Sequence, residues 1–121
     1  MRNISFALTT QAVENRTKTV TRRRGSFWFN NCEVGDLLSG VRKSQGLRPG
    51  EKIERLATIR IVSLTVLYAD DEYIRDNYET VREGFAHLSW GEFVAMFCKH
   101  MKCKPQDVVT RIEFEYVEAT A

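Results

Sequence analysis

The longest stretch typical of a β-strand, residues 53–69, most constrains how this chain can fold. It reads IERLATIRIVSLTVLYA, and apolar and β-branched residues occupy both its odd and its even positions. β-Branched residues favour strands, and apolar side chains on both sides are typical of a strand that is covered on both faces. The segment therefore predicts one long strand that other parts of the chain cover from two sides.

The clearest helix is predicted over residues 89–103, SWGEFVAMFCKHMKC. Ser89 and Glu92 have the spacing of a capping box. Apolar side chains and one histidine then recur at helical intervals: Phe93, Met96, Phe97, His100 and Met101. Such a stripe is more typical of a packed core than of a cofactor site, and we expect His100 to pack at the core or its boundary.

Shorter elements are predicted before and after the long strand. Residues 4–8 form an apolar run, which a short threonine-capped helix can follow. Residues 34–43 are typical of a turn and then a strand, and residues 44–52 hold the glycines and proline of a loop. Residues 70–77 resemble a short helix, and residues 108–116 alternate between two faces as a final strand does.

Together these elements predict an α+β fold, a compact β-barrel of about five or six mixed or antiparallel strands with two or three flanking helices. At 121 residues the chain is expected to form a single domain over residues 1–121. Its 43% hydrophobic and 28% charged residues are those of an ordinary soluble globular protein.

The cysteines and the hydropathy of the chain predict a cytoplasmic protein. The three cysteines form no Cys-x-x-Cys pair, as expected for free thiols in a reducing compartment. Cys98, His100 and Cys103 fit no common zinc spacing, so neither a metal site nor a cofactor is predicted. No segment resembles a signal peptide or approaches the roughly 18 apolar residues of a membrane span, so no membrane partner is expected.

Positive charge is concentrated in the first half of the chain. Residues 1–60 hold 12 Lys and Arg against 5 Asp and Glu, whereas residues 61–121 hold 6 against 11. Five cations fall within nine residues: Arg16, Lys18, Arg22, Arg23 and Arg24. Arginine forks match phosphate geometry, and nearby aromatic rings can stack on bases. The cluster predicts contact with a nucleic acid or nucleotide; the alternative is a solvated charged edge beside a core aromatic cluster.

The local structure of this basic segment is predicted from its residue types. Residues 17–21 are rich in β-branched residues and are expected to be extended, and the Arg-Arg-Arg-Gly-Ser that follows is expected to break the strand. On a strand, Trp28 would point away from the side of Phe27 and Phe29, so at least one of the three should face inward.

Lys18, Thr21 and Glu83 are candidates for chemistry, although pattern alone places all three at the surface. A threonine is a weak nucleophile unless a base activates it, and a lysine serves as that base if its pKa is lowered. A spacing of three residues puts Lys18 and Thr21 on opposite faces of a regular strand, so they meet only if the chain bends. Glu83 precedes a glycine, which suggests a turn; facing Lys18, it could act as an acid or base.

Four motifs follow one another along nearly the whole chain: RTKTVTRR after an opening strand and short helix, VGD before a strand, REGFAHLSWGEFVAMF, and a terminal VTRIEFEYV. In this order they resemble the ASCH family, relatives of PUA-like RNA-binding domains. The family pattern is Gly-x-Lys-x-x-x-x-Arg, which Lys18 and Arg23 match, whereas Arg16 stands where glycine is usual. The resemblance implies a PUA-like small β-barrel with a cleft suited to a nucleotide, a modified nucleoside or RNA.

Some ASCH proteins are similar in a further respect, because they hydrolyse the amide of N4-acetylcytidine and related acylated cytidines. Lys18, Thr21 and Glu83 match their lysine, threonine and glutamate one by one. The resemblance implies that Thr21 is the nucleophile, Lys18 activates it, and Glu83 carries a proton to the leaving amine. Predicted contacts to the substrate or nucleic acid are Arg16, Arg22, Arg23, Arg24 and Trp28.

Two alternatives to an amidohydrolase stay open, since other ASCH proteins are RNA binders or ribonucleases. Residues 44–54 and the arginine run at residues 22–24 lie outside the minimal hydrolase pattern, and both would favour a polymer over a free nucleoside. The hypotheses are therefore an N4-acylcytidine amidohydrolase, a non-catalytic reader of RNA or of a modified base, and a ribonuclease. Convergence of Lys18, Thr21 and Glu83 in one cleft would favour the first.

Overall fold

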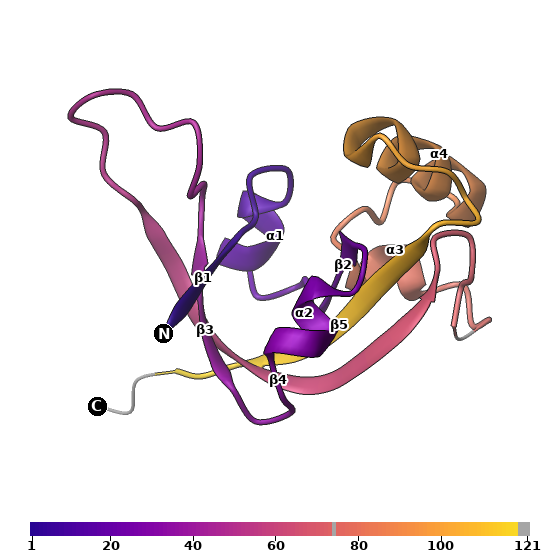
Figure 1. The fold of residues 1–121 in the computed structure, drawn as a ribbon, viewed down its shortest axis with the longest axis horizontal. Coiled ribbons are helices and arrows are strands. Elements are labelled where there is room, and N and C mark those ends of the chain that lie inside the picture. The colour runs from indigo at the N-terminus through magenta and orange to yellow at the C-terminus, as the bar shows by residue number, and fades with distance from the viewer. Residues whose placement is uncertain (74, 119–121) are drawn as a thin grey trace.

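The computed structural model describes residues 1–73 and 75–118, in which a five-stranded sheet is flanked by four helices (Figure 1). The strands are β1 (Arg2–Ser5), β2 (Val20–Arg24), β3 (Leu37–Val41), β4 (Arg55–Tyr68) and β5 (Val108–Tyr116). The helices are α1 (Thr10–Glu14), α2 (Phe27–Asn31), α3 (Glu79–Arg82) and α4 (Trp90–Met101).

The predicted long strand is β4, which lies at the centre of the sheet order β1-β3-β4-β5-β2. β1 pairs with β3 in parallel, and all other neighbouring strands are antiparallel. A register shift between Ile61 and Ser63 interrupts the pairing of β4 with β5, and such a bulge increases local twist. The sheet curls into an open half-barrel (Figure 1). The α+β prediction is confirmed, with four helices in the described residues instead of two or three.

The buried apolar side chains form two clusters. The first joins α1 and α2 to the sheet and comprises Ile4, Phe6, Val13, Cys32, Leu38, Ala57, Ile59, Ile61, Ile112 and Phe114. The second packs α4 against the ends of β4 and β5 and comprises Ala69, Phe93, Val94, Phe97 and Val109. As predicted, Ser89 caps α4: its hydroxyl accepts from the Glu92 N–H, and the Glu92 carboxylate accepts from the Ser89 N–H.

The short helix expected at residues 70–77 is wrong, because the described residues of this segment form turns and bends. Tyr73 and Asn77 have positive φ values of 72° and 67°, which interrupt a right-handed helix. Asp71 and Asp76 each accept a hydrogen bond from the N–H two residues further on. Aspartates that bond locally in this way compete with helix formation.

Phe27, Trp28 and Phe29 lie in the helix α2, so the strand alternation considered for them does not apply. β2 runs through the arginines that were expected to break it and ends at Arg24, and the φ of 77° at the next residue, Gly25, suits glycine. Trp28 packs against the first cluster, as expected of at least one of the three rings, while Phe27 and Phe29 are about half exposed. His100, expected at the core or its boundary, is exposed.

Candidate functional site

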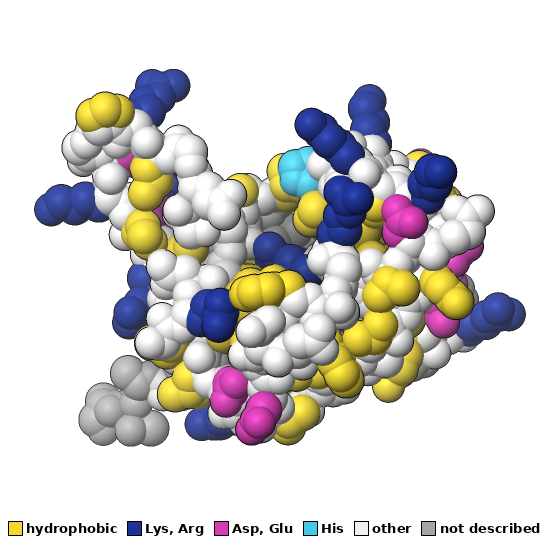
Figure 2. Space-filling model, viewed as in Figure 1, with side chains coloured by type: hydrophobic (Ala, Val, Ile, Leu, Met, Phe, Trp, Pro, Cys, Tyr) yellow, Lys and Arg dark blue, Asp and Glu magenta, His cyan; other side chains and the backbone are white. Residues whose placement is uncertain are grey.

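A pocket of about 130 Å³ lies between the two hydrophobic clusters, with Phe6 of the first and Phe93 and Phe97 of the second among its walls. Figure 2 shows this face hollowed between the β3–β4 loop and α4, with a Lys or Arg side chain visible inside. The charged, hydroxyl and imidazole side chains that line the pocket are Ser5, Thr9, Lys18, Thr21, Arg22, Arg23, Glu83 and His100. Polar groups thus converge in a depression whose walls are largely aromatic, as in many small-molecule sites.

Lys18 and Glu83 form a buried ion pair at this pocket. Lys18 Nζ lies 3.3 Å from Glu83 Oε1 and also donates a hydrogen bond to the Glu83 backbone carbonyl. The side chains of Lys18 and Glu83 are only 1% and 2% exposed. The prediction from pattern alone that Lys18, Thr21 and Glu83 lie at the surface is therefore wrong, because Thr21 is buried as well.

The surroundings of Lys18 lower its pKa to about 8. Burial is the largest cause, because it penalises the charged amine, and the cations of Arg23 and Arg22 act in the same direction. The Glu83 carboxylate opposes them. The rings of Phe6 and Phe85 each have their centroid 5.9 Å from Lys18 Nζ. A lysine in this setting has an appreciable neutral fraction near neutral pH, which a base requires.

Thr21 and Arg23 are neighbours on the pocket wall. Arg23 Nη2 donates to Thr21 Oγ1 at 3.3 Å and to the Ser5 carbonyl at 2.7 Å. Among the described residues, no acceptor pairs with Arg23 Nε, although that atom is buried. Burial lowers the pKa of Arg23 to about 10, against the attraction of Glu83. Arg23 thus contacts the threonine hydroxyl through Nη2, while its buried Nε–H has no partner among the described residues.

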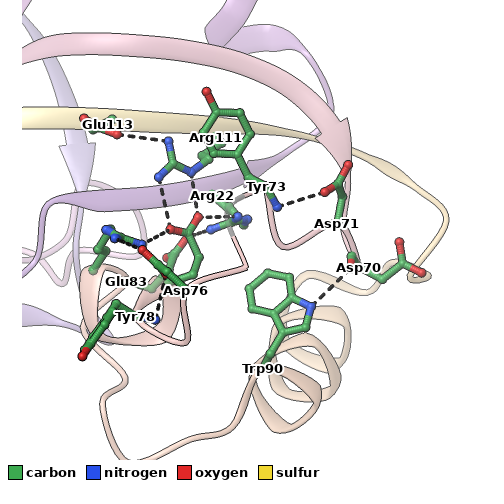
Figure 3. A network of polar contacts seen from close by, with 12 residues as sticks. Arg22, Asp70, Asp71, Tyr73, Asp76, Tyr78, Glu83, Trp90, Arg111 and Glu113 are labelled. Atoms are coloured by element: carbon green, nitrogen blue, oxygen red, sulfur yellow. Dashed lines mark hydrogen bonds and ion pairs between the residues drawn. The ribbon is translucent and has the colours of Figure 1, made fainter.

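Arg22 links Glu83 to a second buried carboxylate, Glu79, which does not line the pocket. Figure 3 shows Arg22, Glu83 and Arg111 in this network. Arg22 Nη1 lies 2.7 Å from Glu83 Oε2, and Arg22 Nη2 lies 2.6 Å from Glu79 Oε2. Arg111 donates two hydrogen bonds to the Glu79 carboxylate, from Nε to Oε2 at 2.7 Å and from Nη2 to Oε1 at 3.1 Å. Arg82 Nη1 donates a further bond to Glu79 Oε1 at 3.3 Å. Burial alone would raise the pKa of Glu79, but its bonds to Arg111 and Arg22 hold it below the ordinary value.

Local backbone features bring Lys18 and Glu83 to the same pocket. Arg16 ends the turn after α1 with a φ of 62°. Lys18 lies two residues before β2 begins, so strand alternation does not determine the direction of its side chain. Glu83 is the C-cap of α3, and Gly84 follows with a φ of 90°. A Cβ at Gly84 would lie 3.1 Å from the Ala12 Cβ, so glycine permits the close approach of α3 to α1.

The remaining predicted contact residues lie outside the pocket lining. Arg16 pairs with Glu118 at 2.7 Å, and its guanidinium lies over the Tyr116 ring at 5.0 Å. Arg24 is exposed and donates to the backbone carbonyl of Met101, a pocket-lining residue, at 3.3 Å. Trp28 packs against the first hydrophobic cluster. Of these three side chains, only Arg24 contacts a residue of the pocket rim.

Sequence analysis missed two residues of the buried network, Glu79 and Arg111. Strand alternation predicts that Arg111 and Ile112 lie on opposite faces of β5, but it does not predict that Arg111 is buried. In the structure the Arg111 side chain is buried, with its guanidinium carbon 4.4 Å from the centroid of the Tyr73 ring. One signal was available, because Glu79 and Glu83 are four residues apart and share one face of a helical turn.

Among the residues that it describes, the structure offers no metal centre and no membrane-spanning helix. No group of three or more His, Cys, Asp or Glu in residues 1–73 and 75–118 is arranged to hold a metal ion. Within those same ranges, none of the helices is long and apolar enough to cross a bilayer.

Comparison with known proteins supports the fold. No protein-family model matches the chain, and no curated protein matches its sequence. Among solved structures, an ASCH domain from Lactobacillus crispatus JV V101 is 13% identical with a TM-score of 0.59, over 95% of this chain and 78% of that one. A protein from Enterococcus faecalis V583 described by the family model DUF984 is 16% identical with a TM-score of 0.61, over 89% and 66%. The hypothetical protein PH0355 is 13% identical with a TM-score of 0.61, over 96% of both chains.

At these identities the likeness is one of fold, and it confirms the expected architecture. The curled mixed sheet and flanking helices have the arrangement of the solved ASCH domain, as expected from the motifs, with the sheet open as a half-barrel.

Proposed function

We propose that this protein hydrolyses the amide of N4-acylated cytidines such as N4-acetylcytidine. The observation that carries the proposal is the buried Lys18–Glu83 pair, 3.3 Å apart, in a pocket that Thr21 also lines. Nucleophile, base and proton carrier must share one cavity for this chemistry. The match of these three residues to the acylcytidine-hydrolysing ASCH proteins supplies the substrate class.

In the proposed reaction, neutral Lys18 accepts the proton of the Thr21 hydroxyl as its oxygen bonds to the acyl carbon. The acyl C–N bond then breaks, and the proton passes by way of Glu83 to the departing amine of cytidine. Water next adds to the threonine ester, giving a carboxylic acid and the free hydroxyl. The Arg23 guanidinium, whose Nη2 donates to Thr21 Oγ1 at 3.3 Å, is a cation suited to stabilise the oxygen that becomes negative in each step.

The size of the pocket supports a substrate with a single ring at its reactive end. Its volume of about 130 Å³ is close to the roughly 150 Å³ of an engineered cavity that accommodates benzene. A pyrimidine is also one six-membered ring, whereas a purine has two fused rings. The walls include Phe6 and Phe85, and aromatic faces stack well on a base.

The test is turnover of N4-acetylcytidine by the purified protein, with cytidine and acetate both quantified. We expect release of the two products in equal amounts, loss of activity in Thr21→Ala, and partial activity in Thr21→Ser, which keeps the hydroxyl. Absence of turnover across pH 6–9, or full activity in Thr21→Ala, would refute the proposal.

A non-catalytic reader of RNA or of a modified base is the second candidate. The observation that favours it is the half-exposed pair of Phe27 and Phe29 on α2, with the Arg2 guanidinium 5.2 Å from the Phe27 ring centroid. Exposed rings beside a cation are typical of surfaces that stack on single-stranded nucleic acid. The two functions separate in Lys18→Met, which should abolish hydrolysis and leave binding to this surface intact.

A further inference from the structure

We infer that Arg22 is a positioning residue, which holds the Glu83 carboxylate in the orientation that presents Oε1 to Lys18. The inference deepens the proposed function and rests on it for its kinetic consequences. Its geometric part concerns only the buried side chains described above.

The two oxygens of Glu83 have different partners. Oε2 accepts from Arg22 Nη1 at 2.7 Å, while Oε1 lies 3.3 Å from Lys18 Nζ. The shorter bond is the anchor, and it orients the carboxylate so that its other oxygen faces the lysine. The other terminal nitrogen of Arg22, Nη2, donates to Glu79 Oε2. The second oxygen of Glu79, Oε1, accepts from Arg111 Nη2 at 3.1 Å.

Burying the charges of this network costs desolvation free energy, which offsets what their ion pairs contribute to the stability of the fold. Three fully buried cations, Lys18, Arg22 and Arg111, share the interior with two buried carboxylates, Glu79 and Glu83. Buried ion pairs often contribute no more stability than apolar residues of similar volume. Arg22 Nε also has no hydrogen-bond partner among the described residues, which adds to the cost of burial. An arrangement of this kind is better explained by the precise placement of Glu83 than by stability.

The charge of Arg22 also bears on the protonation of Lys18. The groups that face Lys18 are Glu83 at the end of α3, Arg22 and Arg23 on β2, and His100 of α4 across the pocket. From β5, the Tyr116 hydroxyl donates to the Lys18 backbone carbonyl. Arg22 holds the Glu83 carboxylate with Oε1 at 3.3 Å from Lys18 Nζ, and without this anchor the carboxylate can close on the amine. Loss of a like charge and a closer carboxylate should both raise the pKa of Lys18.

The test follows the side-chain NMR signals of the six lysines in isotopically labelled protein between pH 6 and 11. Lys18 should titrate near pH 8. In Arg22→Met the midpoint of Lys18 should rise by about one unit or more. Arg82→Met is the matched control, because it removes a different cation from Glu79 without touching Glu83; it should leave the midpoint in place.

A double variant shows whether Arg22 acts through Glu83. In a Glu83→Gln background, adding Arg22→Met should move the Lys18 midpoint by less than half the shift seen with Glu83 present. An unchanged midpoint in folded Arg22→Met, or an equal shift in both backgrounds, would overturn the inference. If Arg22→Met does not fold, Arg22→Lys is the variant to test. It keeps the buried charge, but its single ammonium group cannot bond to Glu79 and Glu83 at the same time. The midpoint should then still rise, and no change would overturn the inference.

The kinetic arm uses N4-acetylcytidine. Arg22→Met should lower kcat at least tenfold with little change in KM, and the rising limb of its pH–rate profile should move upward by the same amount as the NMR midpoint. A fall of the same size in the Arg82→Met rate would indicate lost stability instead and count against positioning. If wild-type protein does not turn over this substrate, the proposed function fails, while the NMR arm still decides the role of Arg22.

Discussion

Lys18 and Glu83 are 65 residues apart in the chain, yet Lys18 Nζ lies 3.3 Å from Glu83 Oε1 and neither side chain is more than 2% exposed. Burial of an amine favours its neutral form, whereas the adjacent carboxylate favours the charged form. Here burial dominates, and the pKa of Lys18 is lowered to about 8. The pair therefore couples the stability of the fold to the same proton that the proposed reaction uses.

This coupling predicts how stability depends on pH. Lys18 has a pKa of about 8 in the folded protein and 10.5 as its ordinary value. Between these two values the unfolded chain binds more protons than the folded one, so the free energy of unfolding should rise with pH. The penalty of keeping Lys18 protonated is complete below pH 8 and amounts to roughly 3 kcal/mol, and it is relieved as the pH approaches 10.5.

Urea unfolding of wild type and Lys18→Met at intervals from pH 7 to 11 measures this effect. The difference between the two proteins should change by roughly 3 kcal/mol in favour of wild type across the window, since all other titrating groups are common to both. Parallel curves would show that Lys18 does not titrate below its ordinary range in the folded protein.

Removing the Glu79 carboxylate should destabilise the protein severely. Glu79→Gln leaves Arg22 and Arg111 buried without the charge that both contact at 2.6–2.7 Å. Breaking one partner of a buried pair costs about 3–5 kcal/mol. Urea unfolding at pH 7 gives the value.

The matched control is Glu115→Gln, which removes an exposed partner of Arg60 at 2.9 Å. Exposed pairs contribute about 0–1 kcal/mol, so this variant should unfold close to wild type. Equal losses in the two variants would contradict the assignment of Glu79 as the centre of the buried network.

The left-handed backbone at Arg16 predicts that glycine is the better small residue there. Arg16→Ala and Arg16→Gly both lose the bond to Glu118, but only alanine retains a Cβ at a φ of 62°. The glycine variant should be more stable than the alanine variant by about 1 kcal/mol. Thermal unfolding ranks the two. A more stable alanine variant would be inconsistent with this backbone conformation.

The cations of the basic segment should differ in their contribution to nucleic-acid binding. Arg24 is exposed beside the pocket rim, whereas Arg16 is paired with Glu118 away from it. If single-stranded RNA binds at the rim, its affinity should fall steeply with salt, and Arg24→Ala should reduce the slope of log K against log salt by about 0.7. Arg16→Ala should leave that slope unchanged.

Fluorescence anisotropy with a labelled oligonucleotide at four salt concentrations measures the slopes. A flat response in wild type would exclude a phosphate-dependent surface. A larger effect of Arg16→Ala than of Arg24→Ala would place the RNA beside Arg16 instead of at the pocket rim.

Much of the architecture could be predicted because its signals are local. Branched side chains marked β4, the capping box at Ser89 and Glu92 marked the start of α4, and period-two alternation marked β5. The error at residues 70–77 arose because Asp71 and Asp76 bond to backbone amides, which gives turns from a composition that also suits a helix.

By itself, the sequence determined the order and kind of the main elements and, through motif order, the candidate trio of Lys18, Thr21 and Glu83. Tertiary structure alone decided their burial and the partnership of Arg22, Glu79 and Arg111. The physical reason is that side-chain periodicity reports which residues share a face of one element, whereas desolvation and charge pairing depend on which elements meet. Two residues of the segment that resembles a solvated basic edge, Lys18 and Arg22, therefore lie in the charged interior of the folded protein.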